Sequence, residues 1–332
     1  MPLFPTGHAP LNVSPADTGR RLRVVHEDTR FGRPEIVTEG VLFRWTGGAR
    51  EGIMRLRERN GTETGVRIDD IKEARVISPE VSAFDMERLA QQGWPSIEME
   101  RMGDWELRRS SGYGDRANSV RVAGPPKSRT VKSYLSFIES WYAERDLAPL
   151  LQIPMPSGMD QTLADLGWNN RRSSRLMTNS VSRLLNETAF ARERIDLDIE
   201  VRDRPDDEWY GLITGYSEQT APEFHHIMDT VQPAAFVYCR NLDGELLGIG
   251  RATLQDTWCG ATTIETKPQA RRRGIAKAIT ARLAVWAQEV GATDWYLQVF
   301  HDNAAARSFY ERFGFTTHHM YGYYVRADRA DR

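Results

Sequence analysis

The sequence predicts an α/β (α+β) chain preceded by a small all-β unit, because strand-like and helix-like segments alternate through its C-terminal part. Residues 260–266 and 295–300 are rich in β-branched and aromatic side chains, as strands are. Between them, apolar residues recur at helical spacing: Ile275, Ile279, Leu283, Trp286 and Val290. A second helix is predicted over residues 304–313, capped by Asp302-Asn303 and ended by Gly314. The order is therefore strand, turn, helix, strand, helix, strand.

The turn before the first of these helices has a composition suited to a diphosphate. Arg271, Arg272 and Arg273 stand directly before Gly274 and the helix start. The first N–H groups of a helix have no internal partner, and the helix dipole makes this end positive. Gly274 has no Cβ, so the backbone can approach a ligand closely. A solvated basic turn is the alternative, but the position at a helix start favours phosphate binding.

Two motifs resemble those of the GNAT superfamily of N-acetyltransferases. Arg271-x-x-Gly274-x-Ala276 resembles the acetyl-CoA signature Q/R-x-x-G-x-G/A, and Asn303-x-x-Ala306-x-x-x-Tyr310-x-x-x-Gly314-Phe315 resembles the second signature. Their order, separation and predicted elements also match, and the resemblance covers residues 195–326. Ala276 and Thr266 depart from the commoner residues without removing a main-chain donor. The three-part layout is similar to that of a group of actinobacterial acetyltransferases.

The resemblance implies an enzyme that moves the acetyl group of acetyl-CoA directly to a primary amine in a ternary complex. It implies that residues of the strand, the turn and the two helices bind this cosubstrate: Ile264, Glu265, Thr266, Arg271, Arg272, Arg273, Gly274, Ile275, Ala276, Asn303 and Tyr310. No cysteine nucleophile is evident, although Cys259 lies on the same strand as Glu265.

Tyr310 and Glu265 are the predicted catalytic residues. In the family, the tyrosine of the second signature lies near the CoA sulfur, where a phenol of pKa about 10 can protonate the leaving thiolate. Several members place a catalytic base on the strand before the phosphate turn, where Glu265 stands. Strand alternation puts Glu265 on the opposite face from Ile264 and Thr266. A core tyrosine and a solvated carboxylate are the respective alternatives.

Other ionisable residues remain open as site residues. Asp256 and His301 lie near predicted strand ends and are further candidate bases, with surface or capping roles favoured. The pair His225-His226 lies in a predicted helix bordering the acceptor cleft, where a surface location is favoured over acceptor contact. His318-His319 would face opposite ways on a strand, and no further ligand spacing is evident, so we predict no metal.

The composition limits the class of protein. A chain of 332 residues with 40% hydrophobic and 27% charged residues is an ordinary globular one. The net charge of −2 gives no general attraction to nucleic acid or anionic membranes, and no run approaches the roughly 18 apolar residues of a membrane span. Residues 1–16 lack the features of a secretory signal, so we expect a flexible tail. Only Cys239 and Cys259 occur, which predicts a reducing, cytoplasmic location.

Residues 17–79 are predicted to form a small SH3-like barrel. Strand-like runs occur at residues 22–25, 36–43, 53–56, 64–68 and 74–77, with one helical turn at 69–71 and a hairpin turn at Asn60-Gly61. Barrels of this kind bind peptides, nucleic acid or a neighbouring domain. Because the excess of arginine is modest, we expect a docking module for a protein partner and no nucleic acid.

Residues 82–190 are predicted to be a degenerate copy of the catalytic fold, which occupies residues 195–330. Helices are expected over residues 82–92, 130–144 and 159–166, and strands from 94, over 104–108, 117–120, 150–153 and 174–180. This order of helices and strands resembles that of the C-terminal half, but residues 123–129 contain no phosphate turn. We therefore expect this copy to form part of the wall of the acceptor pocket or to stabilise the catalytic copy, without binding CoA.

The acceptor is expected to be a small molecule with a primary amine. Similar three-part proteins are described as histone-acetyltransferase-like or as amino-acid N-acetyltransferases, including ones that acetylate glutamate. Arg108, Arg109 and Arg116 offer carboxylate partners, which favours an amino acid such as glutamate over a protein lysine. A non-catalytic acyl-CoA sensor is the other class of hypothesis, against which Glu265 and Tyr310 argue.

Overall fold

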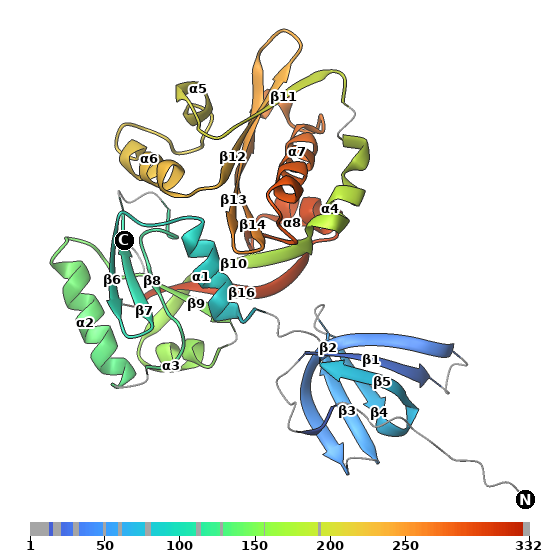
Figure 1. Cartoon of the computed structure of the whole chain (residues 1–332). Helices are drawn as coiled ribbons and strands as arrows, with labels where there is room; N and C mark the ends of the chain where they lie inside the picture. The colour runs from blue at the N-terminus through green and yellow to red at the C-terminus, as the bar shows by residue number, and fades with distance from the viewer. Residues whose placement is uncertain are drawn as a thin grey trace, which may run out of the picture. The chain divides into compact units, whose positions relative to one another are not determined.

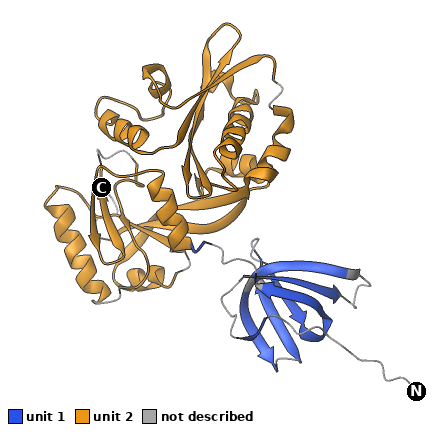
Figure 2. Cartoon of the chain, viewed as in Figure 1, with its two compact units in different colours: residues 1–82 blue, residues 83–332 orange. Residues whose placement is uncertain are grey.

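The chain forms two compact units, residues 1–82 and 83–332 (Figure 2). A computed structural model describes residues 13–15, 21–28, 33–48, 51–58, 62–76, 81–110, 114–126, 129–155, 157–191 and 194–327. The predicted tail, residues 1–16, falls almost entirely outside these ranges, and so does the predicted Asn60-Gly61 turn. None of the described helices has the length and apolar character needed to cross a membrane.

Unit 1 is an antiparallel sheet with the strand order β4-β3-β2-β1-β5 (Figure 1). Its elements are β1 Arg21–Asp28, β2 Arg33–Gly47, β3 Gly52–Arg57, β4 Glu63–Arg67, the short 3-10 helix η2 Ile68–Asp70 and β5 Ile71–Val76. Alternate residues such as Leu22, Val24 and Leu56 are fully buried and form its core. The predicted all-β unit is thus present as a five-stranded sheet, and its description as an SH3-like barrel stays a prediction.

Unit 2 contains two similar successions of strands and helices. The first comprises α1 Ala83–Gln92, β6 Glu98–Met102, β7 Trp105–Arg109, β8 Val120–Arg121, α2 Val131–Ala143, β9 Leu151–Met155, α3 Met159–Asp165 and β10 Trp168–Ser180. α4 Val181–Glu187 and η3 Ala189–Ala191 connect it to the second. The second comprises β11 Leu197–Arg202, α5 Asp207–Tyr210, α6 Ala221–Thr230, β12 Ala234–Asn241, β13 Leu246–Gln255, β14 Trp258–Thr266, η4 Pro268–Ala270, α7 Ile275–Glu289, β15 Asp294–Phe300, α8 Ala304–Glu311 and β16 Thr316–Arg326.

The two copies share one 11-stranded sheet, in the order β11-β12-β13-β14-β15-β10-β16-β9-β8-β7-β6. β10, the last strand of the first copy, pairs with β15 of the second. β16, the last strand of the second copy, pairs with β9 of the first, and β10 and β16 pair with each other. Figure 1 shows β10 and β16 running together between the two copies. Each copy therefore completes its sheet with a strand of the other, which the sequence analysis did not predict.

The regular elements otherwise follow the sequence pattern, but two strand predictions are misplaced. The strand expected from residue 94 begins only at Glu98, as β6. The strand predicted over residues 117–120 is wrong, because only Val120–Arg121 is paired. Ala117 is fully buried but packs in the core of the second copy, with Trp94 and Phe224. An apolar residue in a connection between elements therefore gave a strand-like pattern. β10 also begins at Trp168, earlier than predicted, because its first half pairs with β16.

Two glycines of β13 allow α7 to lie close to the sheet. A Cβ on Gly250 would collide with Cγ2 of Ile279, and a Cβ on Gly248 would lie 2.9 Å from Cγ2 of Ile275. α7 packs over β12, β13 and β14 at the centre of the largest core. Because Gly248 pairs with Thr266, this close packing sets the start of α7 beside the C-terminal end of β14.

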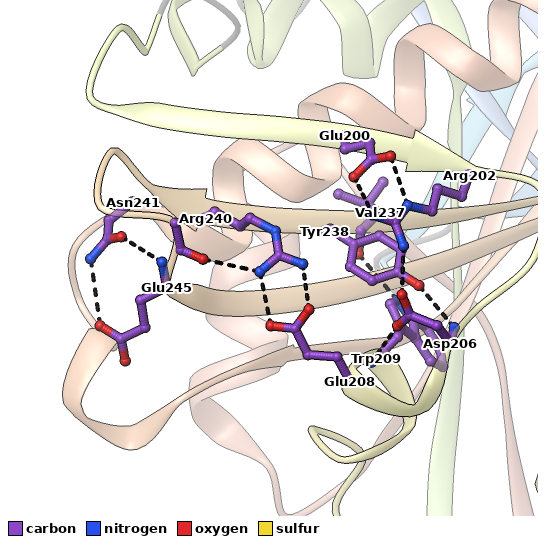
Figure 3. Close-up of polar contacts among 11 residues, drawn as sticks. Glu200, Arg202, Asp206, Glu208, Trp209, Val237, Tyr238, Arg240, Asn241 and Glu245 are labelled. Atoms are coloured by element: carbon purple, nitrogen blue, oxygen red, sulfur yellow. Dashed lines mark hydrogen bonds and ion pairs between the residues drawn. The ribbon is translucent and has the colours of Figure 1, made fainter.

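An ion-pair network holds α5 against β12 (Figure 3). The Asp206 carboxylate caps α5 by accepting from the backbone N–H of Trp209, 3.0 Å away, and accepts from Arg202 Nη1 at 2.6 Å. Arg240 donates to both carboxylate oxygens of Glu208, at 2.8 and 2.5 Å. The guanidinium of Arg202 lies over the ring of Tyr238, 4.2 Å from its centroid. These contacts fix the segment that runs from α5 toward residues 213–214.

Candidate active site

A groove opens where β14 and β15 separate. The two strands pair in parallel from Trp258 and Asp294 as far as Ala261 and Leu297. Beyond that point a cavity of about 260 Å³ lies between them and α8. It is lined by Ala261, Thr262, Thr263, Ile264, Glu265, Leu297, Gln298, Val299, Phe300, Asn303, Ala306 and Tyr310. Main-chain groups of β14 that would face β15 beyond Ala261 therefore face a cavity instead.

A β-bulge shapes the β14 wall of this groove. The register with β13 shifts between Ile249, opposite Glu265, and Arg251, opposite Thr262. Thr263 has φ +54°, in the left-handed region that β-branched residues avoid. Bulges redirect side chains and recur beside active sites, and a strained residue at such a place suggests a functional role. Ile264 packs against the core beneath α7, while Glu265 faces the cavities.

α8 presents one face to the groove. Asn303, Ala306 and Tyr310 line it, at the spacing of one helical face. The Asn303 side chain caps α8 by accepting from the backbone N–H of Ala306, 3.0 Å away. The ring of Tyr310 packs edge-on against Phe309 and Phe315. Burial raises the pKa of Tyr310, so its phenol stays neutral at neutral pH.

The arginine turn lies at the start of α7. Residues 271–274 are exposed, and Gly274 is the N-cap residue with φ +81°. Arg272 is also in the left-handed region, with φ +65°. The first internal helix bond runs from Ala278 N–H to Gly274 O, so the N–H groups of Ile275 and Ala276 have no partner within the helix. Residues 271–276, like Thr266, line neither cavity described here.

Glu265 is held in place by a residue of the α5–α6 connection. The backbone N–H of Thr214 donates to Oε1 and Oε2 at 3.1 and 3.0 Å, and its hydroxyl donates to Oε2 at 2.5 Å. Among the described residues, Oε1 accepts one hydrogen bond and Oε2 accepts two. One acceptor position of Oε1 therefore stays available to a water or an amine.

A second cavity, of about 250 Å³, adjoins the groove. It is lined by Trp94, Gly114, Asp115, Arg116, Ser174, Ile213, Phe224, Ala261, Thr262, Thr263, Glu265, Gln298, Phe300, Tyr321 and Tyr323. Glu265 and Gln298 line both cavities. The second cavity thus reaches the groove at the divergence of β14 and β15, and residues of both copies form its walls.

Arg116 brings a positive charge to the second cavity. Its guanidinium lies 5.3 Å from the centroid of the Trp94 ring. Its Nε is buried without a hydrogen-bond partner, and no described residue forms an ion pair with it. The neighbouring Asp115 is instead paired with Arg171, at 2.6 Å. Arg116 is therefore available to an anionic ligand.

The other two arginines proposed as carboxylate partners are wrong candidates. Arg108 is buried away from both cavities and donates to Ser119 O at 2.7 Å and to Gln152 Oε1 at 2.5 Å. Arg109 is exposed and pairs with Glu98 at 3.4 Å. Of the three, only Arg116 lines either of these two cavities.

The further ionisable candidates lie outside both linings. Asp256 is in the turn before β14, at the opposite end of that strand from Glu265. The ring of His301 accepts from Arg175 Nε at 3.4 Å, on the surface. His225 contacts the Tyr216 hydroxyl, and His226 contacts Ser96 O. Cys259 is fully buried, and burial raises the pKa of its thiol well above the usual value, which disfavours a nucleophilic thiolate.

His318 and His319 belong to a polar network between the copies. Their Nδ1 atoms lie 2.9 Å apart, and His319 Nε2 is 2.8 Å from Oε1 of Glu87 on α1. Glu87 also accepts from Gln152 and from Gln298 Nε2, the latter at 3.4 Å. Within the described ranges, no group of three or more His, Cys, Asp or Glu side chains has the arrangement of a metal site.

Sequence motifs did not identify several residues that line the cavities. Thr263 carries no signal, because a threonine gives no indication of positive φ. Trp94 and Phe224 belong to no motif, and an apolar residue alone does not indicate a cavity wall. Gln298 belongs to a strand that was predicted, but its side chain reaches the site only because β15 diverges from β14.

Comparisons with known proteins find acetyltransferases as relatives of this chain. A family model described as probable histone acetyltransferase Rv0428c C-terminal matches residues 83–324. The chain is 25% identical over 237 residues to the uncharacterized N-acetyltransferase YobR of Bacillus subtilis, covering 70% of this chain and 93% of that protein. It is 28% identical over 250 residues to the probable histone acetyltransferase Rv0428c of Mycobacterium tuberculosis, covering 70% of each.

Solved structures show the same fold. A GCN5-related N-acetyltransferase from Kribbella flavida superposes with a TM-score of 0.57 at 19% identity, over 74% of this chain and 95% of that one. A tandem GNAT protein from the clavulanic acid biosynthesis pathway superposes with a TM-score of 0.54 at 12% identity, over 72% and 86%. The tandem arrangement of two such folds in one chain therefore has a structural precedent.

Proposed function

The chain belongs to the family described as probable histone acetyltransferase Rv0428c C-terminal and is a GNAT N-acetyltransferase, and we propose that it acetylates the amine of a small amino acid. The observation that carries the proposal is the meeting of two cavities at the divergence of β14 and β15. One cavity is a groove leading from this divergence along α8. The other is a pocket with two charged residues of its own, Asp115 and Arg116. Glu265 borders both.

The residues around the groove fit acetyl-CoA, which supplies the acetyl thioester when bound. Free N–H groups at the start of α7, the absence of a Cβ at Gly274 and the charges of Arg271, Arg272 and Arg273 suit its diphosphate. Ile264, Asn303 and Tyr310 line the groove between the two strands and α8. The first copy contains no such turn, so we propose that only the second copy binds acetyl-CoA.

We propose that Glu265 and Tyr310 carry the proton transfers. An amine must lose a proton before it attacks, and the free acceptor position on Glu265 Oε1 can take that proton directly or through a water. Backbone N–H groups of β14 beyond Ala261 can donate to the oxyanion. The neutral Tyr310 phenol can return a proton to the leaving sulfur. The buried Cys239 and Cys259 have raised pKa values, which favours direct transfer over a cysteine intermediate.

Arg116 favours a free amino acid over a protein lysine. The family description refers to histone acetylation, and a lysine side chain also presents a primary amine. However, the carboxyl group of a lysine within a protein is consumed in its peptide bond, whereas a free amino acid offers a carboxylate to Arg116. A cavity of about 250 Å³ also suits a small molecule. Unit 1 stays a proposed docking module for a protein partner.

Substitution at Gly274 tests the cosubstrate site. Gly274→Glu should abolish acetyl-CoA binding in calorimetry, because it adds a negative side chain where the diphosphate is proposed to lie. Gly291→Glu is the matched control, since Gly291 has φ +82° at the other end of α7 and open space around it. This control should bind normally despite equal backbone strain. Equal losses in both variants would contradict the phosphate site.

Turnover tests the reaction itself. The wild-type chain should release CoA from acetyl-CoA when free amino acids are added, and less so with lysine peptides, polyamines or aminoglycosides. Release by no amine in this panel, from protein that binds acetyl-CoA, would favour the non-catalytic acyl-CoA sensor.

A further inference from the structure

We propose that the acceptor is an amino acid with one carboxylate and an aromatic or other apolar side chain, bound by Arg116 and by the aromatic walls of the second cavity. This inference rests on the acetyl transfer proposed above and narrows the acceptor within it. Glutamate and other dicarboxylates are then poor acceptors.

Arg116 is arranged as a receptor for one carboxylate. Its guanidinium lies over the ring of Trp94, 5.3 Å from the centroid, and its buried Nε has no hydrogen-bond partner among the described residues. A buried donor without a partner is unfavourable, so a ligand that accepts from it gains binding free energy. A carboxylate matches the fork of a guanidinium with two parallel hydrogen bonds. The contact with Trp94 keeps the guanidinium at the wall of the cavity that both residues line.

The charges lining the cavity leave no place for a second acidic group. Its charged lining residues are Asp115, Arg116 and Glu265. Asp115 is paired with Arg171 and Glu265 is held by Thr214. A second carboxylate would therefore compete for Arg116 or face these two carboxylates. The nearby Arg172 is exposed and lies over the ring of Phe300, 3.4 Å from its centroid, without being part of the lining.

Aromatic rings form much of the remaining wall. Phe224 is 0% exposed, Tyr321 and Tyr323 are each 2% exposed, and Trp94 is 9% exposed. Phe300, Ile213 and Ala261 complete the apolar part of the lining. Burial raises the pKa of both tyrosines, so these walls carry no charge at neutral pH. Such walls gain most from an apolar or aromatic side chain and offer little to a polyhydroxylated amine.

The two copies contribute different parts of this site. Trp94 and Arg116 come from connections in the first copy, after α1 and before β8. Ile213 and Phe224 come from the α5–α6 region of the second copy, which also supplies Thr214. The first copy thus provides the carboxylate receptor, and the second provides the proposed base and the cosubstrate groove.

Initial rates on the full-length chain test the proposal with acetyl-CoA and four free acceptors: phenylalanine, leucine, glutamate and phenethylamine. Phenylalanine and leucine should have the highest kcat/KM. Phenethylamine, which keeps the ring and lacks the carboxylate, should fall roughly 10- to 100-fold below phenylalanine, as expected for loss of charge-assisted hydrogen bonds. A kcat/KM for glutamate that equals or exceeds the value for phenylalanine would overturn the proposal.

Two arginine variants locate the carboxylate. Arg116→Met keeps an extended apolar stem beside Trp94 and removes the charge, so it should lower kcat/KM for phenylalanine by the same roughly 10- to 100-fold and leave phenethylamine unchanged. Arg109→Met, an exposed position outside the cavity, should change neither. Equal losses for both acceptors would overturn the assignment of Arg116. If Arg116→Met does not fold, the ranking of the four acceptors by the wild-type chain still tests the proposed acceptor class.

The failure of this inference differs from failure of the proposed function. Efficient acetylation of amines without regard to their carboxylate would overturn the acceptor class and leave acetyl transfer intact. If no amine led to release of CoA, both the acceptor class and the proposed acetyl transfer would be overturned.

Discussion

We propose that the hydroxyl of Tyr310 serves the reaction, while its ring serves packing. Its ring contacts Phe309 and Phe315, but no described residue forms a hydrogen bond with its hydroxyl. We expect Tyr310→Phe to lower kcat by roughly 10²–10⁴-fold, the range for loss of a general acid. Acetyl-CoA affinity and thermal stability should stay close to wild type, because the ring and its contacts remain. Single-turnover kinetics with calorimetry measure both effects.

Tyr142 provides the opposite control. Its hydroxyl donates to Arg108 O at 2.8 Å within the first core. Tyr142→Phe should therefore lower the free energy of unfolding by about 1 kcal/mol without changing kcat. A wild-type single-turnover rate in Tyr310→Phe would make Tyr310 a packing residue and leave a water as the acid.

Single residues also show which features of the site the sequence alone predicts and which it does not. Gly274 was identifiable because glycine before a helix start has a direct conformational meaning. Thr263 was not, because its positive φ results from the bulge against β13. Arg108 and Arg116 have the same side chain and lie close in sequence. Only their tertiary surroundings separate a buried structural cation from one that lines a cavity.

At the scale of elements, the ion-pair network on α5 supports the segment that carries Ile213 and Thr214, on the proposed acceptor side of the site. Burial opposes ionisation of Asp206, but bonds from Trp209, Tyr238 and Arg202 outweigh it and lower the pKa of Asp206. A bond from Arg240 likewise lowers the pKa of Glu208. The folded chain therefore binds fewer protons at these positions than the unfolded chain does. Their contribution to stability is present above about pH 4 and is lost as the pH falls below it.

Asp206→Asn tests this pH dependence. Asparagine also caps helices, so the variant removes the charge and keeps the cap. Its melting temperature should be below that of the wild type at pH 7. The difference should shrink at pH 3, because the aspartate of the unfolded chain, with a pKa of about 3.9, is largely protonated there. Glu218→Gln, at an exposed position with no ion pair among the described residues, should match the wild type at both pH values. An equal deficit of Asp206→Asn at both pH values would mean that the ion pairs add nothing.

Helices with strong apolar periodicity were the most predictable elements. α2 and α7 begin and end within a residue or two of the sequence prediction, because their apolar faces are determined locally. β10 was less predictable, since its first half is a strand only by virtue of pairing with β16. The groove itself depends on where β15 leaves β14, and no local pattern encodes that separation.

At the scale of the molecule, the exchange of strands makes the two copies one folding unit. If residues before 195 were removed, β15 and β16 of the second copy would lose β10, the strand that lies between them. It would also lose core residues such as Met177, Val181 and Leu184. The buried Arg251 would lose its bond of 2.9 Å to Gly93 O. The repeated order of elements predicted two copies, but long-range pairing determines that they are not separate bodies.

This exchange predicts how truncated chains behave. Residues 83–332 form a compact unit of their own, so this fragment should unfold in one cooperative transition and bind acetyl-CoA. Residues 195–332 contain the whole proposed phosphate turn. In this fragment β15 loses its partner β10, β16 loses both of its partners, β10 and β9, and the core is opened, which favours aggregation. We expect this shorter fragment to lack a cooperative transition and to bind acetyl-CoA at least tenfold more weakly, one decade being about 1.4 kcal/mol. Thermal melts and calorimetry on both fragments provide the measurement. A shorter fragment that melts and binds like residues 83–332 would show that the exchanged strands are dispensable, and that the first copy serves only the acceptor.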